Sequence, residues 1–375
     1  MQGHLETIKR IRGEKTVYAE PMKGNRHVLL VHEREGEAAY CFSAPLRSKA
    51  EGGSAFGFFP TSDGGFRMEA TDGNVKVKGD MLLFERPDST VCVRLPHTCG
   101  WQEDGEALVG GDIRLTPTTG GVVVHKTLDA GEPFTFRVVP SDLSLGVRSN
   151  SKYFALMEEK YVPSFVIAGI GVFDRGAACH ALSVSHVFEG TGYAVTVEGT
   201  EASRGELVFE LNWYEHKLLQ DTTVEANRPR ENNAFGGVAF VGRSDTFGEQ
   251  RLYLKLDYVM LNEFQNKKLK SARLYLTVLG GENRALEAFV MEKRFCSFGS
   301  TWKEKVGYGK RQLSVCIEDG LCGIDLGPVL IGRTGALKNS YGLLLRGTEG
   351  TQGCLAIATG DSYAYPAVLE LRYEA

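Results

Sequence analysis

The sequence predicts an all-β protein built from two or more β-sandwich units. Apolar and polar residues alternate in short runs, and a period of two is typical of strands. Clusters of Gly, Asn, Asp and Pro separate these runs, and glycine alone makes up 45 of the 375 residues. The usual share of glycine is only about 7%. Long stretches with the 3.6-residue period of a helix are missing, so sandwiches or barrels are indicated.

The strand-like runs follow one another along the whole chain. In the first part they are 27–31, 75–77, 121–124, 134–139, 165–167, 193–197 and 206–211. In the second part they are 237–241, 252–256, 272–278, 285–291, 312–317, 341–345, 354–358 and 368–373. Two segments favour helix instead. Residues 151–160 are good helix formers, although Phe154 and Leu156 also fit the alternation of a strand, and residues 258–269 predict one short helical turn.

A domain boundary is expected between residues 212 and 235. The polar stretch 221–233 contains Pro229 and two consecutive asparagines, which is the composition of a loop or linker. At about 150 residues per domain, the length favours two or three domains. We therefore predict a β-rich region over 1–216 and a β-sandwich over 217–375. A further division of the first region near residue 135 stays open.

Composition argues against several classes of protein. The net charge of −4 argues against a dedicated nucleic-acid binder, which normally carries a basic excess. No run approaches 18 apolar residues, so no membrane span is predicted, and the first residues lack the apolar core of a signal peptide. The eight cysteines form no C-x-x-C pair, which favours free thiols. The oligomeric state is not predicted.

Six short segments between about 221 and 373 resemble, in order, the motifs of a bacterial family. They are Asp221-Thr222-Thr223-Val224, the strand 251–257, the strand 269–276, Ser300-Thr301-Trp302, the pair 324–326 and 341–345, and the strand 365–371. The family is the DNRLRE domain, a β-sandwich of carbohydrate-binding type found on large exported proteins. Residues 142–167 and 192–197 resemble β-rich regions that precede this module in Rhs/YD-repeat and wall-associated proteins. In one departure from the family pattern, Gly327-Pro328 follows Asp325, where the family has a helix-like turn.

The resemblance implies a jelly-roll or galactose-binding-like sandwich at the C-terminal end. It also implies an extracellular or cell-surface location, with a polysaccharide or cell-surface glycan as the partner.

The outward faces of the predicted strands carry the candidate ligand-binding residues. Alternation places Leu252, Leu254 and Leu256 on one side of their strand. The opposite sides offer cations and aromatic rings, which suit sugar hydroxyls, sugar carboxylates and sugar ring faces. These candidates are Arg251, Tyr253, Lys255, Arg273, Tyr275 and Arg372, joined by Trp302 in a Gly/Ser/Lys loop and Tyr308 after it. The alternative is a solvated face whose cations pair with Asp257 and Glu370, and a Trp302 that folds back over a sheet edge.

Metal binding and catalysis leave weaker signals. Loop aspartates at Asp221 and Asp361 are the candidate ligands for a structural Ca²⁺, although a purely structural role is the favoured alternative. No cofactor is predicted. The chain lacks the nucleophile, zinc-protease and phosphate-loop motifs, and His180 and His186 share a strand face without a third ligand.

Together these features predict a non-catalytic carbohydrate-binding or adhesive module of a bacterial surface or secreted protein. Two alternatives stay open. One is a structural β spacer or assembly component of a larger surface, toxin or phage-like apparatus. The other is a hydrolase or lyase with a C-terminal targeting module.

Overall fold

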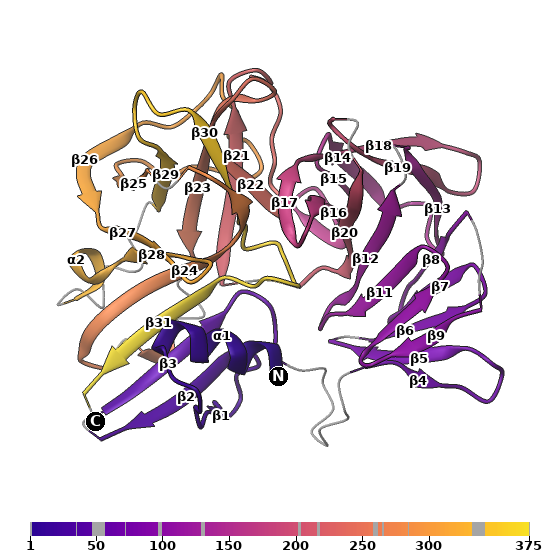
Figure 1. The fold of residues 1–375 in the computed structure, drawn as a ribbon, viewed down its shortest axis with the longest axis horizontal. Helices are drawn as coiled ribbons and strands as arrows, with labels where there is room; N and C mark the ends of the chain where they lie inside the picture. Colours follow the sequence, from indigo (N-terminus) through magenta and orange to yellow (C-terminus); the bar gives the residue numbers. More distant parts are fainter. Residues whose placement is uncertain are drawn as a thin grey trace. The chain divides into compact units, whose positions relative to one another are not determined.

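A computed structural model describes residues 2–34, 36–46, 57–71, 73–96, 100–128, 132–201, 204–215, 218–257, 262–264, 266–283, 285–331 and 342–374. The chain divides into two compact units. Unit 1 contains Met1–Leu46 and His216–Ala375, and unit 2 contains Arg47–Glu215. Antiparallel strands dominate both units, so the predicted all-β class is confirmed (Figure 1).

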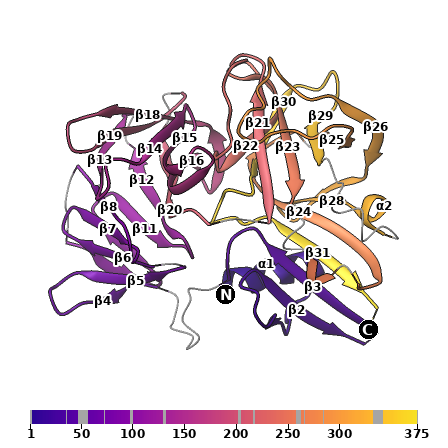
Figure 2. The same cartoon turned by 180° about the vertical axis from the view of Figure 1, so that it is seen from behind.

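Unit 2 contains two antiparallel sheets (Figure 2). The first has the order β14 (Gly146–Asn150), β15 (Tyr153–Glu159), β16 (Val162–Asp174), β20 (Gly205–Trp213), β12 (Gly121–Leu128), β11 (Ile113–Pro117), β10 (Ala107–Gly110) and β9 (Gln102–Asp104), with β17 (Ala177–His180) paired to β16. The second has the order β18 (Leu182–Phe188), β19 (Tyr193–Gly199), β13 (Phe134–Pro140), β8 (Thr90–Arg94), β7 (Met81–Glu85), β6 (Gly73–Lys78), β5 (Phe66–Ala70) and β4 (Phe59–Pro60). Both sheets contribute to one apolar core, which includes Phe84, Phe209 and Trp213.

The helix favoured for 151–160 is a strand, β15. Its first five residues are all buried, because β15 pairs with β14 and β16 inside the sheet. Phe154 and Leu156 enter the core of unit 2, as the alternation allowed. Burial on both faces thus outweighs the helix propensity of the segment.

Unit 1 is a two-layer arrangement folded around one long strand. Its strands run in the order β1 (Glu20–Pro21), β2 (Val28–Glu33), β3 (Gly36–Phe42), β31 (Val368–Tyr373), β24 (Leu269–Gly281), β30 (Gly353–Ala358), β22 (Val238–Ser244), β23 (Gly248–Leu256), β29 (Leu343–Gly347), β25 (Leu286–Met291) and β26 (Tyr308–Leu313). Beside this path, β21 (Leu219–Glu225) pairs with β23, and β28 (Leu321–Asp325) pairs with β24 and β27 (Val315–Glu318).

Strand β24 takes part in both layers of unit 1. Its first part pairs with β31 and β28, and beyond a register shift at Val278 it pairs with β30. Leucines from both layers meet in one core, for example Leu369 from one layer and Leu252 and Leu345 from the other. The leucine face predicted for β23 therefore does point into the core.

Unit 1 is assembled from both ends of the chain. Strand β3 pairs along β31, with Cys41 opposite Leu369, so the N-terminal hairpin continues the C-terminal sheet (Figure 1). The predicted regions 1–216 and 217–375 did not anticipate this pairing, because long-range strand pairing leaves no local trace in the sequence. The contacts divide the chain between residues 215 and 216, and residues 1–46 join the second region.

Helix α1 (Gln2–Arg12) covers the outer face of β2 and β3. Its Ile8 is fully buried against Leu29 and Tyr40. This helix was not predicted from the sequence, although Leu5, Ile8 and Ile11 recur at a spacing of three that suits one helical face. The turn expected within 258–269 is the 3₁₀ segment η1 (Asn262–Phe264), and residues 258–261 lie outside the described part.

The linker predicted for 221–233 begins as a strand. Residues Asp221 to Glu225 belong to β21 and are buried, because β21 pairs with β23 over its whole length.

The segment after Asp325, where the sequence departs from the DNRLRE motif, forms a short helix, α2 (Gly327–Leu330). Pro328 lies in its first turn, where a missing N–H costs nothing.

Seven cysteines lie in the described part of the chain, and all seven are free thiols. Within the same residues, no helix has the length and apolar character needed to cross a membrane.

Candidate functional site

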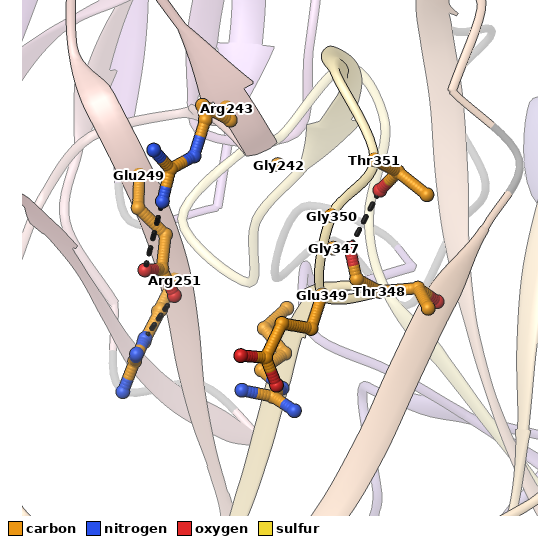
Figure 3. A pocket seen from close by; sticks show the side chains of 10 residues that line it. Gly242, Arg243, Glu249, Arg251, Gly347, Thr348, Glu349, Gly350 and Thr351 are labelled. Carbon is orange, nitrogen blue, oxygen red and sulfur yellow. Dashed lines mark hydrogen bonds and ion pairs between the residues drawn. The ribbon is translucent and has the colours of Figure 1, made fainter.

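The candidate site is a surface pocket of about 150 Å³ in unit 1. The end of β22 and the start of β23 form one side of the pocket, and the connection from β29 to β30 forms the other (Figure 3). Its lining residues are Gly242, Arg243, Glu249, Arg251, Arg346, Gly347, Thr348, Glu349, Gly350 and Thr351. Guanidinium, carboxylate and hydroxyl groups therefore surround one small space.

Ion pairs hold the pocket's arginines to different degrees. Arg251 Nε donates to Glu249 Oε1 at 2.6 Å, and Arg346 Nη2 lies 3.0 Å from Glu287 Oε2. Arg243 reaches the same Glu249 carboxylate only at 3.9 Å, and its side chain is 58% exposed. Figure 3 shows Arg243 and Arg251 on either side of the Glu249 carboxylate. Arg243 is thus the arginine with the most spare hydrogen-bonding capacity.

Aromatic rings alternate with Arg251 and Arg346 beside the pocket. The Arg251 guanidinium carbon lies 4.9 Å from the Trp302 ring centroid and 5.9 Å from that of Tyr308. The Arg346 guanidinium carbon lies 5.3 Å from the Tyr308 centroid and 5.2 Å from that of Phe289. We call these five residues the arginine–aromatic ladder. Cation–π contacts and ion pairs together hold both guanidinium groups in place.

The ladder rests on a covered sheet face. Tyr253 is fully buried with Phe295, and its hydroxyl donates to the Val306 carbonyl at 3.0 Å. Burial raises the pKa of Tyr253. The segment between β25 and β26 therefore folds over the face that alternation predicted to be open, and Tyr253 is not accessible to a ligand.

Glycines allow the close backbone approach at the base of the pocket. Gly242 has φ +134°, and a Cβ there would lie 2.3 Å from the Gly353 carbonyl oxygen. A Cβ on Gly347 would lie 3.0 Å from the Gly242 Cα. Side chains at these positions would force the strand ends apart.

The predicted ligand-binding residues thus fall into two groups. Arg251, Trp302 and Tyr308 come together in the ladder, and Lys255 is half-buried further along β23, opposite Gln220 of β21. The others, Arg273, Tyr275 and Arg372, belong to β24 and β31 in the other layer.

Tyr275 and Arg372 of this second group contact the buried carboxylate of Glu370, and Arg273 lies opposite Glu370 in the strand register. Tyr40 donates to Glu370 at 2.8 Å, and Arg372 Nη2 lies 3.0 Å from it. Burial, followed by the charge of Glu370, raises the pKa of Tyr275, which packs in the cluster beneath α1. The pairing of Arg372 with Glu370 is the alternative that the sequence analysis left open.

Both candidate metal ligands are buried and hydrogen-bonded within unit 1. Asp221 is buried in β21, and its Oδ2 accepts a hydrogen bond from the Gly360 N–H at 2.7 Å. Asp361 is also buried, and its N–H donates to Thr359 Oγ1. Among the described residues, no three His, Cys, Asp or Glu side chains are grouped to hold a metal ion.

Several pocket residues were missed by sequence reasoning. Arg243, Arg346 and Glu349 follow or end strands, and nothing local shows that they meet. One signal was available: Arg346-Gly347-Thr348-Glu349-Gly350-Thr351 is a polar, glycine-rich turn between two apolar strands, a typical place for binding residues.

Comparison of the sequence with protein-family models finds no matching model, and comparison with curated proteins finds no similar protein.

Proposed function

We propose that this chain is a non-catalytic glycan-binding module of a bacterial surface or secreted protein. The pocket between β22–β23 and the β29–β30 connection is its sugar site. The observation that carries the proposal is the mixture of groups around that pocket. Guanidinium groups donate, carboxylates accept and threonine hydroxyls do both, which matches the alternating donors and acceptors of a sugar ring.

Two further features support the proposal. The arginine–aromatic ladder immobilises Arg251 and Arg346 before a ligand arrives, which reduces the entropy lost on binding. The resemblance to the DNRLRE domain covers the same unit of the chain. The Glu249 carboxylate is committed to two guanidinium groups, which suits a binding role better than proton transfer.

A glycan array with the intact chain, run with and without Ca²⁺, tests the proposal. Arg243→Gln removes the most available donor, and we expect it to weaken binding about tenfold or more, because bonds to charged groups are among the strongest in a site. Arg94→Gln is the matched control. Arg94 is 56% exposed and also lies 3.9 Å from a carboxylate, that of Asp80, but in unit 2. The absence of binding by folded protein would reject the proposal.

An assembly role is the second candidate function. Strand β18 lies at one edge of its sheet, first in the strand order, and Val187 and Phe188 on it are 64% and 56% exposed. An edge strand with exposed apolar side chains favours contact with another chain. Light scattering of the intact chain and of a Val187→Ser/Phe188→Ser variant tests this role. An assembly role predicts that the intact chain forms an oligomer and that the variant does not.

A further inference from the structure

We infer that the pocket binds a neutral sugar in preference to an acidic one. Arg243 donates a hydrogen bond to a sugar oxygen, and Glu349 accepts one from a sugar hydroxyl. This inference rests on the proposed glycan-binding function and names the class of ligand. It departs from the acidic sugar that the abundance of arginine and lysine would suggest.

Internal ion pairs balance most of the charge on the pocket's arginines. Arg251 and Arg346 are each held by a glutamate at 3.0 Å or less, so their positive charge is largely balanced. Arg243 is only loosely paired with Glu249. Its donors remain available to a ligand oxygen.

Glu349 lines the side of the pocket opposite Arg243 (Figure 3). Its side chain is exposed, and the structure gives it no ion pair with any described residue. An ionised carboxylate only accepts hydrogen bonds, so its partner on the ligand must be a donor. A sugar hydroxyl meets that need, whereas a uronate or sulfate group would be repelled. A ligand that satisfies both Arg243 and Glu349 must both accept and donate.

The size of the pocket and the contacts of the Trp302 ring beside Arg251 limit how a sugar can bind. The pocket holds about 150 Å³, below the roughly 300–1,000 Å³ of pockets for drug-sized ligands. It therefore suits one sugar ring or the end of a chain. Arg251 and Lys305 both lie over the Trp302 ring, at 4.9 and 4.5 Å from its centroid. Because cations already occupy the Trp302 ring, hydrogen bonds rather than stacking carry the recognition.

The test compares matched neutral and uronate polymers of the same sugar configuration, such as a galactan and a polygalacturonate. Binding is measured for the intact chain, Arg243→Gln, Glu349→Gln and the control Glu318→Gln, at low and high salt. Glu318 is an exposed glutamate on β27 that does not line the pocket. We expect the neutral polymer to bind more tightly, with little salt dependence. We expect both pocket variants to weaken it about tenfold, the loss that one hydrogen bond to a charged group accounts for.

The polymer that the intact chain binds more tightly decides the class of ligand, and Glu349→Gln tests whether that ligand contacts the pocket. Loss of a negative charge weakens a hydroxyl ligand but strengthens an anionic one. Tighter binding of the uronate polymer than of the neutral polymer by the intact chain would overturn this inference and leave glycan binding intact. Pocket variants that bind like Glu318→Gln would also overturn it, because the glycan would then bind elsewhere. A folded chain that binds no polymer would reject the proposed function itself.

Discussion

Arg251 bridges the Trp302 ring and the Glu249 carboxylate, with its guanidinium carbon 4.9 Å from the ring centroid and its Nε 2.6 Å from Glu249 Oε1. The contact connects strand β23 to the segment that folds over it. The pocket and the packing of unit 1 therefore share the Arg251 side chain, and we expect its substitution to affect both stability and the proposed binding.

Trp302→Ala is expected to destabilise unit 1 by about 2 kcal/mol, since Trp302 is half-buried and loses both packing and a cation–π contact. Trp302→Phe should retain most of that stability. Calorimetry is the measurement, with Trp101→Ala as the matched control because Trp101 packs on the core of unit 2. The prediction is wrong if Trp302→Ala leaves the melting of unit 1 unchanged.

Tyr40→Phe is expected to cost about 1.5–3 kcal/mol, the range for a hydrogen bond to a charged group. The substitution removes the donor to Glu370, which is only 5% exposed, and leaves that carboxylate one partner short. Tyr18→Phe is the control, because Tyr18 is 87% exposed. Equal free energies of unfolding in urea for the two variants would contradict the role of Tyr40.

His4 should make unit 1 less stable as the pH falls below about 6.5, the pKa of an unperturbed histidine. Its two ring nitrogens are buried without a hydrogen-bond partner among the described residues, and its ring meets Phe42 edge-on at 4.7 Å. Burial, followed by the charge of nearby groups including His27, lowers its pKa to about 3. Between pH 6.5 and 3 the unfolded chain binds the extra proton, so stability is lost as the pH falls, by at most about 1.4 kcal/mol per pH unit.

Urea unfolding between pH 7 and pH 5, where most carboxylates stay ionised, isolates this effect. We expect His4→Phe to flatten the slope. His32→Gln is the control, because Glu20 and then Glu37 raise the pKa of exposed His32. The contribution of His32 to the free energy of unfolding has the opposite sign to that of His4. It is present at low pH and is lost as the pH rises through the pKa of His32 in the folded protein. A slope that survives His4→Phe would assign the pH dependence to other groups.

Gly242→Ala is expected to destabilise unit 1 by about 1–3 kcal/mol, because its left-handed φ and the nearby Gly353 carbonyl both exclude a Cβ. Gly307→Ala is the matched control, since nothing lies within 4 Å of a Cβ there. Thermal unfolding of both variants is the measurement. A Gly242→Ala protein as stable as the control would show that the pocket floor can move.

Residues 217–375 alone should not unfold cooperatively. The fragment lacks Val28, Ala39 and Cys41 from its core and leaves an edge of β31 unpaired. Residues 47–215 should fold alone, because every residue of that core lies within unit 2. Circular dichroism during thermal unfolding measures both, and a sharp transition from the 217–375 fragment would contradict the shared-end architecture.

The candidate site could be predicted only in part. Arg251, Trp302 and Tyr308 were each identified from residue type and position, and they do come together. Tyr253 was placed on the correct side of its strand, but the sequence did not reveal that another segment covers that side. Arg243 and Glu349 lie more than 100 positions apart, and no local pattern connects them.

The sequence by itself determined the all-β class and the inward faces of strands such as β23, because a period of two and frequent turn residues act locally. Only the tertiary structure decided which strands are neighbours, that β3 joins β31, and that Tyr253 and Tyr275 are buried in separate clusters. The physical reason is that strand pairing uses backbone hydrogen bonds that every residue except proline can form, so the choice of partner depends on the packing of the complete core.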